Sequence, residues 1–294
     1  MRILLLLFCL INSLVLCSQT KDTLKKTRPV ETFYADETFK SSRIILGQSV
    51  ENPPNGALVF MVSHNFGAIN SGAYEFFGLD QAVTRIGLEY GATNFMAFGV
   101  GRSTYNKTFD GYLKFRILRQ SKGKKNIPLS ISAFGNTSVN TLKLSDPNEK
   151  DYFDARLSYC TELILARKFG NLFSLQIAPT WIHKNLVATP EDHNNIFSIG
   201  GGISFRVSDM ISLNAEYHYL VPGQHLGDQT NSVAISCDIK TGKHVFQLYL
   251  SNSQENYEQA FITETNGKWY NGDIYFGFTI HRLFTVKYPR IPEK

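Results

Sequence analysis

The chain has 294 residues, of which 43% are hydrophobic, 13% aromatic and 19% charged, and its formal net charge is +5 at pH 7. This length allows one large domain or two ordinary ones, and all-β barrels commonly use it as a single unit. Because the basic residues are scattered and form no stripe or patch, the charge does not point to a nucleic-acid partner.

The first element is an apolar segment, residues 3–16, which follows the positively charged Arg2. The segment is too short and too early for a membrane-spanning helix, and it predicts a secretory signal peptide over residues 1–18. Lipid attachment at Cys17 is the alternative, although a leucine precedes this cysteine where a small residue is usual. No later apolar run approaches the roughly 20 residues of a spanning helix. We therefore expect an exported chain without a helical anchor.

Residues 19–54 are polar and charged and show no clean hydrophobic period. We expect a loosely structured periplasmic segment here, followed by a β-barrel over residues 55–294. Cys160 and Cys237 are the cysteines that remain after the signal peptide, and two cysteines do not make a disulfide scaffold. Because the sequence contains no Cys-x-x-Cys and no His-Glu-x-x-His motif, we expect neither a metal nor a cofactor.

From Gly56 to the end, apolar residues alternate with polar or small ones, and clusters of Gly, Asn, Asp or Pro interrupt the pattern. No amphipathic helix stands out. The alternation predicts twelve strands, at about 56–66, 81–91, 93–103, 109–120, 127–138, 152–168, 172–183, 196–207, 211–221, 230–240, 243–251 and 272–284.

A triple glycine, residues 200–202, lies inside one of these strands and raises the question of a phosphate-binding loop. Phe197, Ile199, Ile203 and Phe205 alternate around it without a break, and no helical pattern follows. A phosphate loop needs the amino terminus of a helix to complete the anion site. We therefore interpret the glycines as structural: they relieve crowding on the inner face of a curved sheet or mark a bend.

Three features favour a transmembrane barrel with its apolar side outward. Most predicted strands have 10 or more residues, whereas ordinary strands have about 5–6 and tilted membrane strands about 9–11. The polar face is small and of mixed charge, and short connections alternate with long ones, as in outer-membrane barrels. The fold class is therefore all-β, an antiparallel up-and-down barrel of about 12 strands. A soluble secreted β-sheet binding protein is the alternative.

The charged residues of the polar face are the candidate functional residues. They either form a structural network across the lumen or line a path that selects small ions or solutes by charge. The amino-terminal segment is also a candidate plug. The candidate lumen residues are Arg85, Glu89, Lys114, Arg116, Arg156, Glu162, Arg206, Glu216, His218, Asp238 and His281.

An outer-membrane phospholipase or esterase is an alternative, because such enzymes also use twelve strands. The candidate bases are His183, His193, His218 and His225, with serines nearby. No Gly-x-Ser-x-Gly elbow occurs, and the serines are spread evenly over the polar face. We therefore assign no catalytic residues and expect a non-enzymatic protein.

Residues 64–103 carry a recognisable pattern. His64 begins a His-x-Phe-Gly, Asp80 ends a Phe-Phe-Gly-Leu-Asp, Arg85 begins an Arg-x-Gly-x-x-Tyr-Gly, and Arg102 belongs to a Gly-x-Gly-Arg-Ser. The pattern resembles a family of exported bacterial outer-membrane β-barrel proteins of unknown function, typical of the Bacteroidota. The resemblance implies an envelope barrel and no particular reaction. The four polar residues suggest a shared feature, such as holding the first long loop over the lumen.

The sequence thus predicts an exported protein of the outer membrane of a Gram-negative bacterium, in contact with membrane lipid. Its expected role is a narrow pore for small ions or solutes, or an envelope scaffold.

Overall fold

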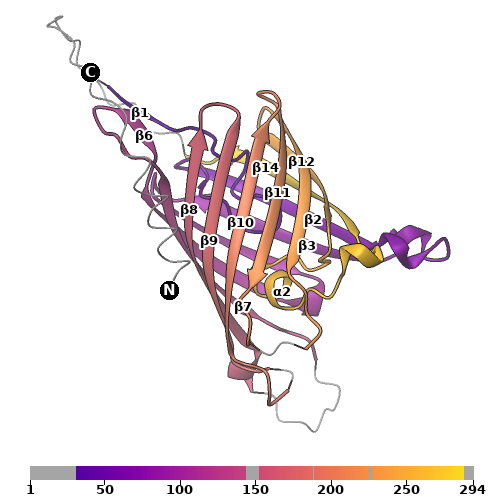
Figure 1. Ribbon diagram of the computed structural model, residues 1–294. Coiled ribbons are helices and arrows are strands. Elements are labelled where there is room, and N and C mark those ends of the chain that lie inside the picture. Colours follow the sequence, from indigo (N-terminus) through magenta and orange to yellow (C-terminus); the bar gives the residue numbers. More distant parts are fainter. Residues whose placement is uncertain (1–30, 144–151, 188, 225–226, 288–294) are drawn as a thin grey trace, which may run out of the picture.

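The computed structural model describes residues 31–143, 152–187, 189–224 and 227–287, so the expected signal peptide lies outside the described residues. Twelve antiparallel strands form one closed barrel (Figure 1). No helix among the described residues is long and apolar enough to span a membrane. The barrel strands are β2 (Ala57–Ala68), β3 (Ala82–Gly91), β4 (Met96–Ser103), β5 (Phe109–Leu118), β7 (Ser130–Val139), β8 (Leu157–Phe169), β9 (Phe173–Lys184), β10 (Asn195–Arg206), β11 (Ile211–Leu220), β12 (Ser232–Thr241), β13 (His244–Ser251) and β14 (Tyr275–Thr285).

The predicted fold class is confirmed, and each of the twelve predicted ranges overlaps one barrel strand. Four strands, β4, β7, β8 and β14, begin three or more residues later than predicted. β8 begins at Leu157 because the 3-10 turn η4 (Phe153–Arg156) precedes it. β4 begins at Met96 because the Thr93 hydroxyl accepts the Met96 N–H at 2.9 Å and closes the turn before the strand.

The apolar side chains of the strands point outward. Phe197 on β10 is 52% exposed, whereas its neighbour Ser198 is 2% exposed. On β11, Leu213 is exposed and Glu216 is buried. A globule in water has the opposite arrangement, so the alternation places a hydrocarbon-facing surface outside and a polar wall inside.

The two ends of the barrel differ. One end has short turns, such as residues 207–210 and 242–243, and we call it the short-turn end. The other has longer connections, including 140–156 and 252–274, and we call it the long-loop end. Both ends of the described chain lie at the short-turn end, because Thr285 pairs with Ala57 and the small strand β1 (Thr32–Tyr34) pairs with β6 (Ser121–Gly123) in the connection between β5 and β7.

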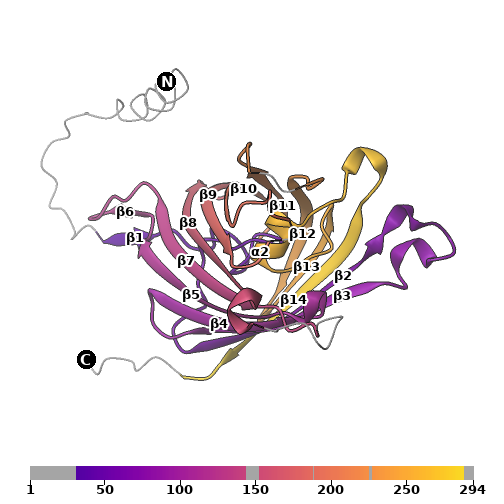
Figure 2. The ribbon, with the colours of Figure 1, turned by 90° about the horizontal axis from the view of Figure 1, so that it is seen from below.

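Two chain segments fill the interior (Figure 2). From the short-turn end, residues 41–50 enter as a narrow hairpin, held by an Arg43–Gln48 bridge and by the Ile44 N–H donating to the Gly47 carbonyl at 2.9 Å. From the long-loop end, residues 252–271 bring in the short helix α2 (Glu258–Thr263). We call these the lumenal hairpin and the lumenal loop.

The lumenal hairpin differs from the expectation of a loosely structured, periplasmic segment over residues 19–54 and agrees with the alternative of an amino-terminal plug. Residues 38–40 and 43–50 are buried, and so is all of α2. Their apolar side chains complete a small core with apolar residues of the inner wall. This core contains Ile44, Ile45, Leu46, Val50, Phe261 and Ile262 from the segments and Phe134, Ile164, Ile182 and Ile196 from the wall.

The triple glycine of β10 makes room for the hairpin. A Cβ on Gly202 would lie 2.3 Å from Ile44 Cδ1, and a Cβ on Gly200 would lie 2.9 Å from the ring of His218. Gly201 faces outward, and its Cβ would be 3.9 Å from the nearest atom. The inward glycines therefore relieve crowding, which is one of the two roles expected from the sequence.

Replacing Gly202 by valine is expected to lower the melting temperature, because Ile44 is itself buried and overpacking a filled interior costs about 1–3 kcal/mol. Gly201→Val is the matched control on the outer face of the same strand. Both can be followed by gel electrophoresis after heating, since folded and unfolded barrels migrate differently. An equal loss of stability in the two variants would contradict this account.

Candidate functional site

Glu216 on β11 binds the tip of the lumenal hairpin. Its carboxylate accepts the backbone N–H groups of Ile45 at 2.8 Å, Leu46 at 3.2 Å and Gly47 at 2.8 Å. The His218 ring lies 2.7 Å from the same carboxylate. A buried carboxylate is costly without such donors, and hydrogen bonds to a charged group are the strong ones. The hairpin tip therefore supplies the partners that this wall charge needs.

Lys114 on β5 binds the base of the hairpin. Its ammonium donates to the carbonyls of Ser42 at 3.1 Å and Ser49 at 3.2 Å, and to Gln48 Oε1 at 3.0 Å. The carboxylate of Glu89 lies 3.9 Å away. Because Ser42 and Ser49 stand on opposite strands of the hairpin, one wall cation holds both strands together.

Wall amides complete the contacts with the hairpin backbone. Gln176 on β9 accepts the Val50 N–H at 2.9 Å and donates to the Gln48 carbonyl at 2.7 Å. Gln247 on β13 donates to the Ile44 carbonyl at 2.8 Å. The hairpin is thus bound through its backbone by side chains from several parts of the wall.

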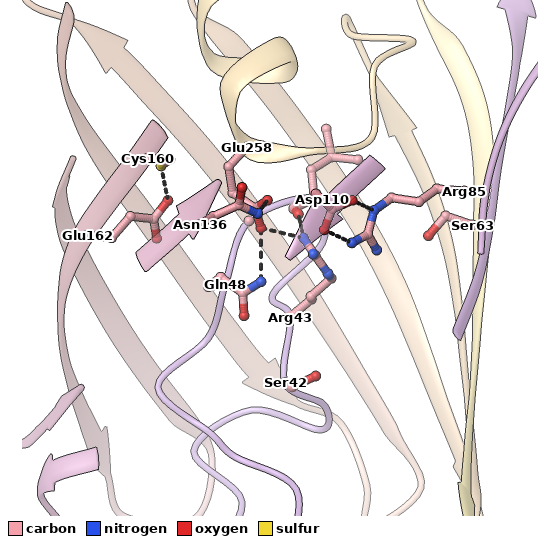
Figure 3. Close-up of polar contacts among 12 residues, drawn as sticks. Ser42, Arg43, Gln48, Ser63, Arg85, Asp110, Asn136, Cys160, Glu162 and Glu258 are labelled. Carbon is pink, nitrogen blue, oxygen red and sulfur yellow. Dashed lines mark hydrogen bonds and ion pairs between the residues drawn. The ribbon is translucent and has the colours of Figure 1, made fainter. Parts of the chain in front are cut away.

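The two lumenal segments meet at an ion pair. Arg43 of the hairpin donates to Glu258 of α2 at 2.8 Å, and Gln48 donates to the same carboxylate oxygen at 2.9 Å (Figure 3). Asn136 on β7 approaches the other oxygen at 3.4 Å. Burial alone would raise the pKa of Glu258, but Arg43 holds that pKa below its ordinary value, and Glu258 in turn raises the pKa of Arg43. Both groups are therefore charged in the closed lumen.

At the short-turn end, acidic residues of the amino-terminal segment contact basic residues of the wall. Glu51 lies 3.2 Å from Arg116, and Glu37 lies 3.3 Å from Arg206 and also contacts Lys240. The segment thus carries acids where the mouth of the barrel carries cations.

The structure places most of the predicted lumen residues on the inner wall. Arg116 and Arg206 lie partly buried at the short-turn mouth. Arg156 differs from the expectation: it lies in η4, before β8 begins, and donates to the carbonyls of Asn140 and Leu142. The predicted lumen residues that face inward and are buried are Arg85, Glu89, Lys114, Glu162, Glu216, His218, Asp238 and His281.

These wall charges rarely pair with one another. Among the described residues, the pairs within the predicted set are Lys114 with Glu89 and His218 with Glu216, whereas Glu216, Arg116 and Arg206 also bind the amino-terminal segment. Asp238 accepts from Ser236 and Gln247, and His281 contacts Gln247 as well. Cys160 donates to Glu162 across 3.8 Å.

Three functional residues were missed at the sequence level. Asp110 on β5 forms a two-point pair with Arg85, with Nη2 to Oδ2 at 2.5 Å and Nε to Oδ1 at 3.1 Å. Asp110, Tyr112 and Lys114 are spaced two residues apart and share the inward face of β5, so the period-2 pattern contained this signal. Arg43 and Glu258 lie in segments without a period, and no pattern marked them.

The family-motif residues do not form one site. Arg85 is inside the barrel, whereas His64 faces outward and stacks on Phe278 at 5.4 Å. Arg102 faces outward over the ring of Phe109, and Asp80 is exposed in the β2–β3 connection. This connection projects away from the barrel, and the lumenal loop enters the lumen in its place (Figure 1).

The histidines considered for a hydrolase are dispersed. His183 contacts Asn195, His193 is exposed in a loop, and His218 is buried beside Glu216. His225 lies outside the described residues. Within the described ranges no serine hydroxyl hydrogen-bonds to a histidine, and no group of three His, Cys, Asp or Glu side chains is arranged to hold a metal ion.

Comparisons with known proteins agree with the fold. A family model described as "Membrane bound beta barrel domain (DUF5777)" matches residues 39–284. No curated protein matches the chain.

Among solved structures, the KdgM porin shares 8% identity at a TM-score of 0.47, covering 78% of this chain and 99% of that one. The NanC porin shares 9% identity at 0.48, covering 79% and 100%. The Ralstonia pickettii toluene transporter TbuX shares 10% identity at 0.39, covering 84% and 97%. Likenesses at this level carry no information about function.

Glu216→Gln is expected to loosen the hairpin tip, because an amide offers one acceptor oxygen where the carboxylate offers two. A loss of about 1–3 kcal/mol corresponds to roughly 5- to 150-fold faster hydrogen exchange at the amides of Ile45, Leu46 and Gly47. Glu89→Gln is the matched control, since Glu89 does not contact these amides. Unchanged exchange at the tip in Glu216→Gln would show that the hairpin is not held there.

Proposed function

We propose, since the chain belongs to the family of membrane bound beta barrel domains (DUF5777), that it is an outer-membrane protein that forms a narrow passage for small polar solutes, closed by its two lumenal segments. The short-turn end then faces the periplasm and the long loops face outward, as is usual for bacterial outer-membrane barrels. The apolar outer surface contacts membrane lipid, and the amino-terminal leader exports the chain.

The observation that carries this proposal is the polar wall behind the lumenal hairpin. Glu216, Lys114 and Gln176 bind the hairpin through backbone atoms, so their side chains would line a hydrophilic channel if the hairpin left. Buried charges add little stability compared with well-packed apolar residues of the same volume. A wall of this composition is what a passage for polar solutes needs.

A second candidate is a permanently closed envelope scaffold. The apolar contacts of Ile45 and Phe261 inside the lumen favour it, because they oppose departure of either segment. In both cases we propose a non-enzymatic protein, since the buried His218 contacts a carboxylate that is already occupied by hairpin amides.

Planar-bilayer recording separates the two candidates. The full-length protein is expected to be closed most of the time. A truncated chain that begins at Asn52 is expected to conduct in bursts. The same truncated chain, with residues 254–266 replaced by a short Gly/Ser linker, is expected to conduct steadily. The graded increase follows because each change removes one of the two segments from the lumen. Migration before and after boiling checks that each variant is folded.

A folded double variant that carries no current would remove the passage and leave the scaffold. Steady conductance by the full-length protein would instead show that the lumenal segments do not close the barrel.

A further inference from the structure

A cavity of about 350 Å³ lies at the short-turn mouth, between the amino-terminal segment and the wall. Residues 36–37, 39–42 and 51–54 form one side, and the β12–β13 turn with part of β14 forms the other. This volume is within the range of small-molecule sites, which are roughly 300–1,000 Å³. The cavity is therefore large enough for a small organic solute.

Basic side chains surround the carboxylate of Glu37 at this cavity. Lys40, Lys240 and Lys243 all line it, and Glu37 contacts Lys240 directly and lies 3.7 Å from Lys40. The same carboxylate also lies 3.3 Å from Arg206. No ion pair of Lys243 occurs within the described ranges. Glu37 thus neutralises only part of the positive charge gathered around it.

The other acids that line the cavity are directed to other partners. Glu51 pairs with Arg116 at 3.2 Å, and Asp36 lies 3.7 Å from Arg119. Neither forms an ion pair with Lys240 or Lys243 in the described part of the chain. The cavity therefore keeps an excess of positive charge beside Glu37.

The backbone at Glu37 is strained. Its φ is +48°, a left-handed conformation that a non-glycine residue rarely adopts and that persists only where the surroundings enforce it. Burial would raise the pKa of Glu37, but Lys240, Lys40 and Arg206 lower it overall. Burial and Arg206 lower the pKa of Lys40. The residue whose carboxylate meets these cations is therefore also one whose backbone is strained.

Ser41, Ser42, Asn52 and His281 add polar groups to the lining, and the rest of it is apolar. Phe39, Val59 and Val245 are buried and Leu283 lies beside them. A site that combines a few cations with an apolar floor fits a solute that has an anionic group and an apolar body. Inorganic ions would leave the apolar part of the cavity unfilled.

We propose that this cavity binds a small organic carboxylate from the short-turn side, and that Glu37 occupies the ligand's anion position in the closed barrel. Lys240 and Lys243 are the wall groups that bind the carboxylate, and a bound ligand takes Lys240 away from Glu37. This proposal deepens the proposed function. It rests on that function in one respect, namely that the bound ligand loosens the segment that closes the passage.

Chemical rescue tests the site. Glu37→Ala is expected to lower the melting temperature of the detergent-solubilised full-length chain, and benzoate is expected to restore about 2–4 °C relative to chloride at equal ionic strength. Acetate, which lacks the apolar body, should restore less. The control is Glu37→Ala combined with Lys240→Gln, in which the rescue should be absent.

A second readout uses the unaltered protein and does not depend on the folding of a variant. Benzoate is expected to speed hydrogen exchange at the hairpin amides of residues 45–47 at least threefold, and to have no such effect in Lys240→Gln. Equal responses to benzoate and chloride, or equal responses with and without Lys240, would overturn the proposal. Because neither readout uses current, a failure here is distinguishable from a failure of the passage itself.

Discussion

The carboxylate of Glu216, facing three backbone N–H groups of the hairpin tip, is the interaction on which the closed barrel depends. A membrane barrel turns its apolar side chains toward lipid, so its polar and charged side chains must gather in the lumen. In a barrel of twelve strands that space is narrow, and each charge there requires water or a partner. The amino-terminal segment supplies these partners largely as backbone groups. The side chains of the wall bind them while the barrel strands keep their pairing.

The contacts that hold the amino-terminal segment differ with depth in the lumen. At the short-turn mouth, wall cations contact the acids Glu37 and Glu51 of the segment. Deeper inside, the hairpin brings its own cation, Arg43, to the lumenal loop. The glycines of β10 give the hairpin the space to approach. The amino-terminal segment is therefore acidic where it passes the basic mouth and basic where it meets Glu258 of the lumenal loop. This order of charges fixes how deep the segment lies in the lumen.

The barrel itself could be predicted from the sequence, because the period of two runs through most of each strand, apart from irregularities near Arg116 in β5 and Tyr275 in β14, and sorts outward from inward residues. Phe197 and Leu213 were correctly placed outward, and the family expected from residues 64–103 is confirmed by a match over residues 39–284. Asp110 was predictable from the same alternation and was overlooked. The start of β8 was not predictable, since the residues of η4 continue the alternating pattern but form a 3-10 turn.

The filling of the lumen lay beyond what local patterns reveal. Arg43 and Glu258 are 215 residues apart and belong to segments with no period, so only the closed fold brings them together. The hairpin is held mainly through its backbone, and backbone hydrogen bonds leave little trace in the choice of side chains. The sequence therefore indicated that the wall was charged, and the structure was needed to show what neutralises it.

The position of the hairpin in the native membrane is the most direct test of this account. In a chain carrying Ile44→Cys and Gly202→Cys, mild oxidation of isolated outer membranes should join the two cysteines, and mass spectrometry of the digested protein should recover the linked peptides in high yield. Ile44→Cys with Gly201→Cys, on the outer face of the same strand, should stay unlinked. Free thiols at residues 44 and 202 under oxidation that links a reference disulfide would contradict the closed barrel.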